Sequence, residues 1–141
     1  TATFDVPYEP GTLKAVNSKG KEEFVLKTAG EPAAIRLIAD RSKIKACKND
    51  LSYVKIELVD KNGNVVPETS LPVKIECTGK GTVIAGGNAA YADMESFRSL
   101  TPNTFRGKAI AIVQPDGEKG DIQVKVSAKG LEDASIVITT Y

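Results

Sequence analysis

The fold class is decided by residues 51–64, which read LSYVKIELVDKNGN. Within this stretch, residues 51–60 form the best strand candidate of the chain, because apolar and charged side chains alternate along it. Asn62 and Gly63 follow at once, and Asn-Gly between two apolar runs is the strongest short signal for a β-hairpin turn. The stretch therefore predicts an antiparallel β-hairpin built on a half-buried strand.

The apolar side of this strand changes phase once. Leu51 and Tyr53 occupy odd positions, whereas Ile56 and Leu58 occupy even ones, and the change falls around Val54. We expect both pairs to point inward, with either a β-bulge or a doubly buried strand start at the change of phase.

Outward from this stretch, short apolar runs recur every ~8–12 residues, with Gly, Pro, Asn and Asp between them and almost no helical period. This spacing predicts an all-β protein, an immunoglobulin-like β-sandwich with antiparallel strands and Greek-key connections. The chain has no Trp, so it is not an antibody-type domain. The strands that we expect in the sandwich are residues 34–39, 42–46, 51–60, 65–67, 71–77, 82–85, 108–114, 121–128 and 134–140.

The first 30 residues differ from the rest. Two strand candidates, residues 12–16 and 22–28, are joined by a tight turn at 19–21 and predict one hairpin. A lone hairpin is marginal in water, so we expect it to be the remnant of a preceding β-domain. Residues 28–32 (TAGEP) have Gly and Pro two residues apart, which is typical of a linker. We therefore divide the chain into residues 1–30, the hairpin and linker, and residues 31–141, the sandwich.

Composition excludes several functions. The 141 residues include 19 basic and 18 acidic ones, so no net field favours nucleic acid or a membrane surface. No apolar run is long enough for membrane insertion, and the first ten residues do not resemble a signal peptide, so we expect any targeting signal to lie outside the chain. The chain has no His, which removes Ser/His/Asp and Cys/His catalysis.

The chain has two cysteines, Cys47 and Cys77, which are too few for a Cys-rich zinc site. A disulfide between them is one interpretation in an oxidising compartment. The other is that Cys77, in phase with Val73 and Ile75, is a small core residue.

The long loop within residues 86–114 is the candidate site. Loops of this length in a compact domain are usually functional or disordered, and its aromatic residues argue against disorder. Two interpretations stay open: the aromatic side chains bind sugar, or they seal one end of the sandwich. A helical turn over residues 92–99, capped by Asp93, is a further expectation. The candidate contact residues are Asn88, Tyr91, Glu95, Phe97, Arg98 and Phe105.

Acidic residues offer no clear catalytic pair. Asp93 and Glu95 share one loop, whereas Glu57 and Glu76 lie on separate strands, and glycosidase chemistry needs two facing carboxylates. We predict no catalytic residue, no metal ligand and no cofactor. Residues 60–64 place oxygen ligands close together, as calcium loops do, but a type I′ turn would use the same residue types.

Four parts of the chain together resemble glycoside hydrolase family 2, the β-galactosidases especially. Residues 6–16 (VPYEPGTLKAV) resemble the closing strands of the domain that follows the catalytic barrel. Residues 28–41 resemble the junction to an immunoglobulin-like domain, and 50–67 its second strand and hairpin. In the long loop, the matching residues are Gly87-Asn88, Glu95-Ser96-Phe97 and 105–114. The chain departs from the family pattern at Cys47 and at 89–91.

The resemblance implies a non-catalytic accessory domain of a bacterial β-galactosidase-type enzyme, which hydrolyses terminal β-D-galactosides with two carboxylates on a separate barrel. It implies an architectural role, with the upstream domains of the same chain as partners. It also implies an exported, periplasmic or extracellular enzyme. Alternatives are a carbohydrate-binding module using the 91–105 loop and an adhesion-type domain of the bacterial surface. We further expect the exposed hairpin to allow dimers of the isolated chain.

Overall fold

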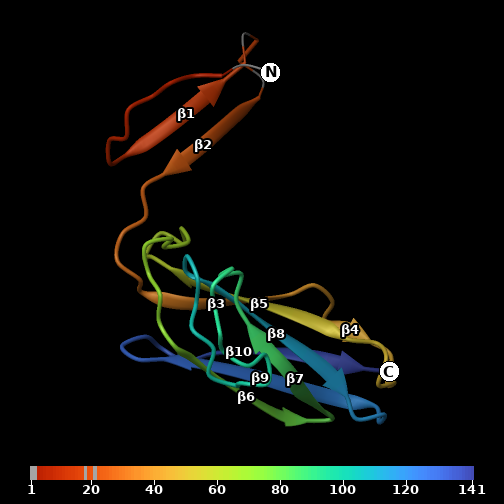
Figure 1. Ribbon diagram of the computed structural model, residues 1–141. Helices are drawn as coiled ribbons and strands as arrows, with labels where there is room; N and C mark the ends of the chain where they lie inside the picture. The colour runs from red at the N-terminus through yellow and green to blue at the C-terminus, as the bar shows by residue number, and fades with distance from the viewer. Residues whose placement is uncertain (1–2, 18, 21) are drawn as a thin grey trace.

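The computed structural model describes residues 3–17, 19–20 and 22–141, and within these ranges the chain is all β (Figure 1). A separate hairpin precedes two packed sheets. The strands of the described residues are β1 (Thr12–Val16), β2 (Glu23–Lys27), β3 (Ala34–Ala39), β4 (Lys43–Ile44), β5 (Ser52–Val59), β6 (Val73–Gly79), β7 (Gly81–Gly87), β8 (Lys108–Pro115), β9 (Gly120–Ala128) and β10 (Ala134–Thr140).

The two sheets have the strand order of an immunoglobulin constant-type sandwich. In the described residues one sheet runs β3-β5-β8-β7 and the other β4-β10-β9-β6. These orders correspond to strands A, B, E and D against A′, G, F and C. All strand pairs are antiparallel except β4 with β10. The sequence prediction of an all-β sandwich with Greek-key connections is confirmed.

The core lies between the inner faces of both sheets, where apolar residues alternate with exposed ones. β9 shows this most clearly, because Ile122, Val124 and Val126 are fully buried while the residues between them face solvent. Burying an aliphatic side chain contributes about 1.5–3 kcal/mol, so the core is the main source of stability. Its other fully buried members include Val54, Ile56, Leu58, Val73, Ala111, Val113 and Ile138.

The expected phase of β5 is wrong at its start. Ser52 and Val54 are buried together with Ile56 and Leu58, whereas Tyr53 points outward and is 41% exposed. The pairing of β5 with β3 and β8 is continuous, so no bulge interrupts it. Ser52 is tolerated in the core because its hydroxyl donates to the carbonyl oxygen of Arg41 at 2.8 Å. A buried serine thus hid the even phase of the strand.

Other strands are shorter than expected, are absent, or begin at a different residue. The strand expected at 42–46 is only β4, which adds two residues to the β10 edge and still buries Ile44. The strand expected at 65–67 is reduced to a single bridge between Val59 and Val65. The strand expected at 71–77 begins two residues later, as β6. No helix occurs in the described residues, so the helical turn expected over 92–99 is wrong.

Two tight turns differ from the prediction in their backbone conformation. In the turn after β5, Gly63 has a positive φ (81°) but Asn62 does not, so this is not a type I′ turn. The two-residue turn with positive φ at both positions is Arg106-Gly107, closed by paired hydrogen bonds between Phe105 and Lys108. Arginine in this left-handed region carries a steric cost of about 1–2 kcal/mol, so Arg-Gly is not a typical sequence for this kind of turn.

The hairpin β1–β2 stands apart from the sandwich and is joined to it by an extended linker (Figure 1). Its strands pair antiparallel from Thr12–Lys27 to Val16–Glu23, as the sequence predicted. The expected turn at 19–21 includes Lys21, which lies outside the described residues. Both faces of the hairpin are exposed, including its large apolar side chains Leu13, Val16, Phe24, Val25 and Leu26.

Candidate functional site

The second half of the long β7–β8 loop covers the edge of the sandwich. Residues 100–104 run beside Leu71, Val73 and Ile75, with backbone hydrogen bonds of 2.8–3.0 Å from Ile75 to Leu100, from Val73 to Pro102 and from Thr104 to Leu71. The segment thus satisfies backbone groups that the edge of β6 would otherwise present to another chain. Within this segment, Pro102 and Thr104 are buried.

The first half of the loop, residues 88–99, carries large exposed side chains, and it returns to β7 at Phe97, whose carbonyl oxygen accepts the Gly86 amide at 2.7 Å. Tyr91, Met94 and Phe97 are 99%, 96% and 70% exposed. The interpretation that the aromatic side chains seal one end of the sandwich is therefore wrong for Tyr91, whereas the Phe97 ring is largely exposed but lies against Gly87 of β7. The seal is made instead by backbone pairing and by the buried Pro102 and Thr104, and the large side chains form an outward-facing tip.

A polar cluster holds this tip in shape. The side-chain amide of Asn88 donates to the Asp93 carboxylate and to the carbonyl oxygen of Asn103, and its own oxygen accepts the amide of Ala90. The Glu95 carboxylate accepts both the backbone and side-chain N–H groups of Asn103. Asp93 accepts the amide of Glu95 in a local turn in place of the helix cap that we expected. The acids of the loop are therefore used by its own framework.

The structure brings only part of the candidate set together. Asn88, Glu95 and Phe97 line a cavity of about 30 Å³ at the base of the tip. This volume suits one water molecule and is too small for a sugar ring. Tyr91 and Arg98 lie outside the cavity and are exposed.

Phe105 is also separate from the tip. It is half-buried at the start of the Arg106-Gly107 turn, and the Arg106 guanidinium lies over its ring at 5.6 Å. This is a cation–π contact at a surface site, worth about 0.5–1 kcal/mol. Phe105 therefore supports the turn that leads into β8.

The turn after β5 holds the linker. Asp60 is buried, and one oxygen of its carboxylate accepts the amides of Asn62 and Asn64 at 2.8 and 2.9 Å. The other oxygen accepts the amide of Gly30, thirty residues away, at 2.9 Å, and the side-chain amide of Asn64 at 3.0 Å. The carboxylate thus connects the linker to the sandwich.

These donors lower the pKa of Asp60 to about 2 from its ordinary value of 3.8, with the Gly30 amide as the largest cause. A lowered pKa means that the ionised carboxylate stabilises the fold at every pH above about 4. That contribution is lost as pH falls through about 2. The same donors argue against calcium, because a cation needs the oxygen lone pairs that N–H groups occupy here.

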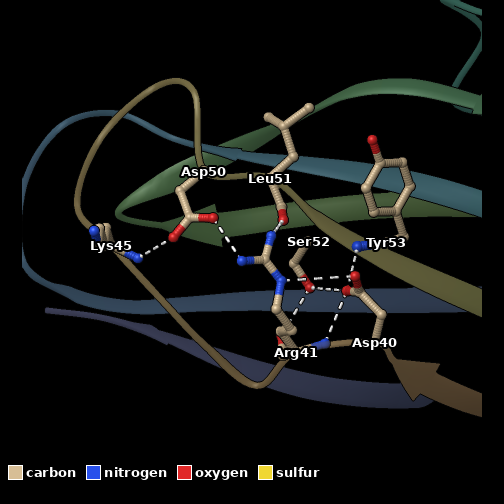
Figure 2. A network of polar contacts seen from close by, with 7 residues as sticks. All are labelled: Asp40, Arg41, Lys45, Asp50, Leu51, Ser52 and Tyr53. Carbon is tan, nitrogen blue, oxygen red and sulfur yellow. Dashed lines mark hydrogen bonds and ion pairs between the residues drawn. The ribbon is translucent and has the colours of Figure 1, made fainter.

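A second network, missed from sequence, joins the two sheets near β4 (Figure 2). The Arg41 guanidinium donates to the Asp50 carboxylate at 2.6 Å and to the carbonyl oxygen of Leu51. Asp50 also accepts the Lys45 amide at 2.7 Å, and Asp40 accepts the Tyr53 amide at 2.7 Å. The network holds the segment that crosses from β3 in one sheet to β4 in the other.

The same contacts shift the pKa values of Asp50 and Arg41. The Lys45 amide and then Arg41 hold the pKa of Asp50 below its ordinary value, and Asp50 raises the pKa of Arg41. Since the pKa of Asp50 is lowered on folding, its contribution to stability is present at neutral pH and is lost in acid.

Replacing Arg41 by alanine should lower the melting temperature by several degrees, because Asp50 and the Leu51 carbonyl lose their shared donor. Arg98→Ala is the matched control, because Arg98 is exposed and forms no ion pair among the described residues. Differential scanning calorimetry at neutral pH measures both variants. Equal melting temperatures for the two variants would show that the network does not stabilise the crossing.

The remaining sequence candidates lie apart. Glu57 is buried on β5 and pairs with Arg36 at 2.6 Å, whereas Glu76 lies on β6 and pairs with Lys74 at 2.8 Å. They belong to different sheets, so they do not form a facing carboxylate pair. Both cysteines are free in the described structure. Cys47 is exposed, and Cys77 packs against the core, where burial raises the pKa of its thiol.

Comparison with known proteins identifies the family of this β-sandwich. The model of the glycoside hydrolase family 2 C-terminal domain 5 matches residues 35–137. A β-galactosidase of Bacteroides ovatus is 34% identical over 137 residues, and one of Thermoanaerobacter pseudethanolicus is 30% identical over 123. These matches cover 95% and 82% of this chain, but each covers only 16% of the relative.

Solved structures give the same picture. A crystal structure of a glycosyl hydrolase family 2 member from Bacteroides cellulosilyticus superposes with a TM-score of 0.90 and 39% identity. The superposition covers 96% of this chain and 19% of that one. The chain belongs to the glycoside hydrolase family 2 C-terminal domain 5 family. It is an accessory, immunoglobulin-like domain of that family, and the family resemblance found in the sequence is confirmed.

Proposed function

We propose that the chain forms part of a larger enzyme that hydrolyses terminal β-D-galactosides, and that its role there is architectural. The observation that carries this is the coverage of the curated relatives: nearly all of this chain aligns with 16% of a β-galactosidase. The acids of the described residues are engaged in hydrogen bonds or ion pairs of the framework wherever we considered them for catalysis. Catalysis is therefore assigned to another part of the enzyme.

The partners that we propose are the upstream domains of the same chain. Both faces of the β1–β2 hairpin are exposed, which an independent hairpin in water would not sustain. Its apolar side chains would be covered if it paired with further strands of a preceding domain. The exposed tip of Tyr91, Met94 and Phe97 offers a second apolar contact to such a neighbour.

Removal of this domain from the whole enzyme tests the proposal. The truncated enzyme should melt at a lower temperature and aggregate sooner, because the surface that this domain covers is exposed. Its remaining folded molecules should still hydrolyse p-nitrophenyl β-D-galactopyranoside, and the isolated chain should not. Unchanged melting together with a selective loss of binding to galactose polymers would contradict an architectural role and favour sugar binding.

We also propose that the enzyme is exported to the periplasm or the cell surface. The family resemblance to exported hydrolases is the support for this location. Cell fractionation followed by detection of the whole enzyme with an antibody to this domain tests it. Recovery of the enzyme in the cytoplasmic fraction alone would contradict it.

Dimers of the isolated chain are expected through the free edges of β1 and β2. An uncovered two-stranded sheet presents unpaired N–H and C=O groups on both sides, which favours strand addition by a second copy. Sedimentation velocity over a range of concentrations should show a monomer–dimer equilibrium. A chain reduced to residues 29–141 is the control and should stay monomeric; equal dimerisation of both would place the interface elsewhere.

A further inference from the structure

Two hydrogen-bonded units meet at residues 28–33. On the hairpin side the last backbone bond runs from the amide of Thr28 to the carbonyl oxygen of Gly11 at 2.8 Å. The Gly11 amide returns a bond to the Thr28 hydroxyl at 2.9 Å. On the sandwich side the first bond of the sheet runs from the amide of Ala33 to the carbonyl oxygen of Val59 at 2.8 Å. Residues 29–32 connect these two frameworks.

Within this connection, Gly30 is held by Asp60. Its amide donates to the Asp60 carboxylate at 2.9 Å, and the contact is partly buried. Among the described residues, this bond leaves Ala29 as the only residue between the last hydrogen bond of the hairpin and the first hydrogen bond to the sandwich. Without it the unbonded stretch would run from Ala29 to Pro32. Each residue contributes at most two freely rotating backbone dihedral angles. The bond therefore strongly reduces the motion of the hairpin relative to the sandwich.

The anchor itself is rigidly supported. The turn that carries Asp60 is closed by the amides of Asn62 and Asn64 on the same carboxylate. Its far side is held by Arg36, whose guanidinium donates to the carbonyl oxygen of Gly63 at 2.9 Å. Arg36 is in turn fixed by the buried Glu57 carboxylate on β5 at 2.6 Å. Asp60 is therefore attached to the sheet from both sides of its turn.

We propose that Asp60 is a latch that fixes the direction in which the preceding unit leaves the sandwich. The latch shortens the stretch without hydrogen bonds to Ala29 alone and holds the hairpin beside the 65–69 segment, with which it shares a groove. In a larger chain, the same carboxylate would set the angle between this domain and the one before it. This inference goes beyond the proposed function and can be tested on the 141-residue chain alone.

Residual dipolar couplings of backbone N–H groups provide the test. In the wild-type chain, the couplings of β1–β2 and of the sandwich strands should fit one alignment tensor. In Asp60→Asn, which replaces half of the acceptor with an N–H donor, the hairpin should need a second, smaller tensor. Exchange of the Gly30 amide with solvent should also become about tenfold faster or more, because a hydrogen bond to a charged acceptor is lost.

Three further variants separate the latch from general damage. Asp116→Asn is the matched control, because Asp116 accepts the amide two residues later just as Asp60 does but lies in the β8–β9 turn. Gly30→Pro removes the donor and leaves Asp60 and its turn intact. Gly30→Ala keeps the donor, and its new Cβ would meet Asp60 only at ordinary contact distance.

The proposal predicts independent hairpin motion in Asp60→Asn and Gly30→Pro, and one common tensor in Asp116→Asn and Gly30→Ala. Two results would overturn it: a wild-type hairpin that already aligns independently, or a common tensor retained in both Asp60→Asn and Gly30→Pro. Neither result bears on the galactosidase proposal, because no measurement involves the larger enzyme or its activity.

Discussion

Replacing Gly79 by alanine is expected to lower the free energy of unfolding by at least about 2 kcal/mol, from strain at φ above zero and a disrupted backbone hydrogen bond. Gly79 ends β6 with φ of 95° and lies directly against the backbone of Asp121 in β9. An added Cβ would overlap the carbonyl oxygen of Asp121, which also accepts the Lys80 amide at 2.9 Å. The β6–β7 turn would have to move away from β9.

Gly130→Ala separates strain from overlap. Gly130 also has a positive φ, 83°, but a Cβ there would meet no atom within 4 Å. Its replacement should therefore cost only the conformational term of about 1–2 kcal/mol. Urea unfolding followed by circular dichroism measures both variants. If the two variants lose the same stability, the close approach of Gly79 to β9 is not a constraint on the fold.

Replacing Ile56 by alanine should cost about 2–5 kcal/mol, through lost burial and the cavity left behind. Ile56 lies at the centre of β5, is 0% exposed, and is next to the registered pair of Lys55 with Ile38. The midpoint of urea unfolding should fall while the slope of the transition is kept, since the surface exposed on unfolding hardly changes.

Ile38→Ala is the matched control for this substitution. It removes the same atoms from the neighbouring strand, β3, but Ile38 is 36% exposed on the outer face. Its cost should stay below about 1 kcal/mol, as for a surface position that can be resolvated. A comparable cost for both would show that the outer face of this sheet is packed in solution, for instance against a second copy.

The sequence predicts the sandwich well because its strands carry local signals. The bounds of β3 and β10 agree with the expected ones, since turn residues flank both apolar runs. The inward phase of β9 is also right, because Ile122, Val124 and Val126 alternate with polar residues. Where a buried polar residue replaces an apolar one, as Ser52 does on β5, the pattern misleads.

The candidate site is less predictable, because its contacts are non-local. The pairing of residues 100–104 with the edge of β6 has no local period, so the sequence points only to the aromatic side chains as candidates for sealing the sandwich or binding sugar. The turn at Asp60 is visible in sequence, but its bond to Gly30, thirty residues earlier, is not.

Isothermal titration calorimetry of the 141-residue chain with galactosides and galactose-containing oligosaccharides most directly tests the architectural role. We expect no saturable heat, since the described loop forms a cavity of only about 30 Å³ and uses its acids internally. A saturable signal that disappears in Tyr91→Ala, in a variant with unchanged melting temperature, would contradict it and make the domain a carbohydrate-binding module.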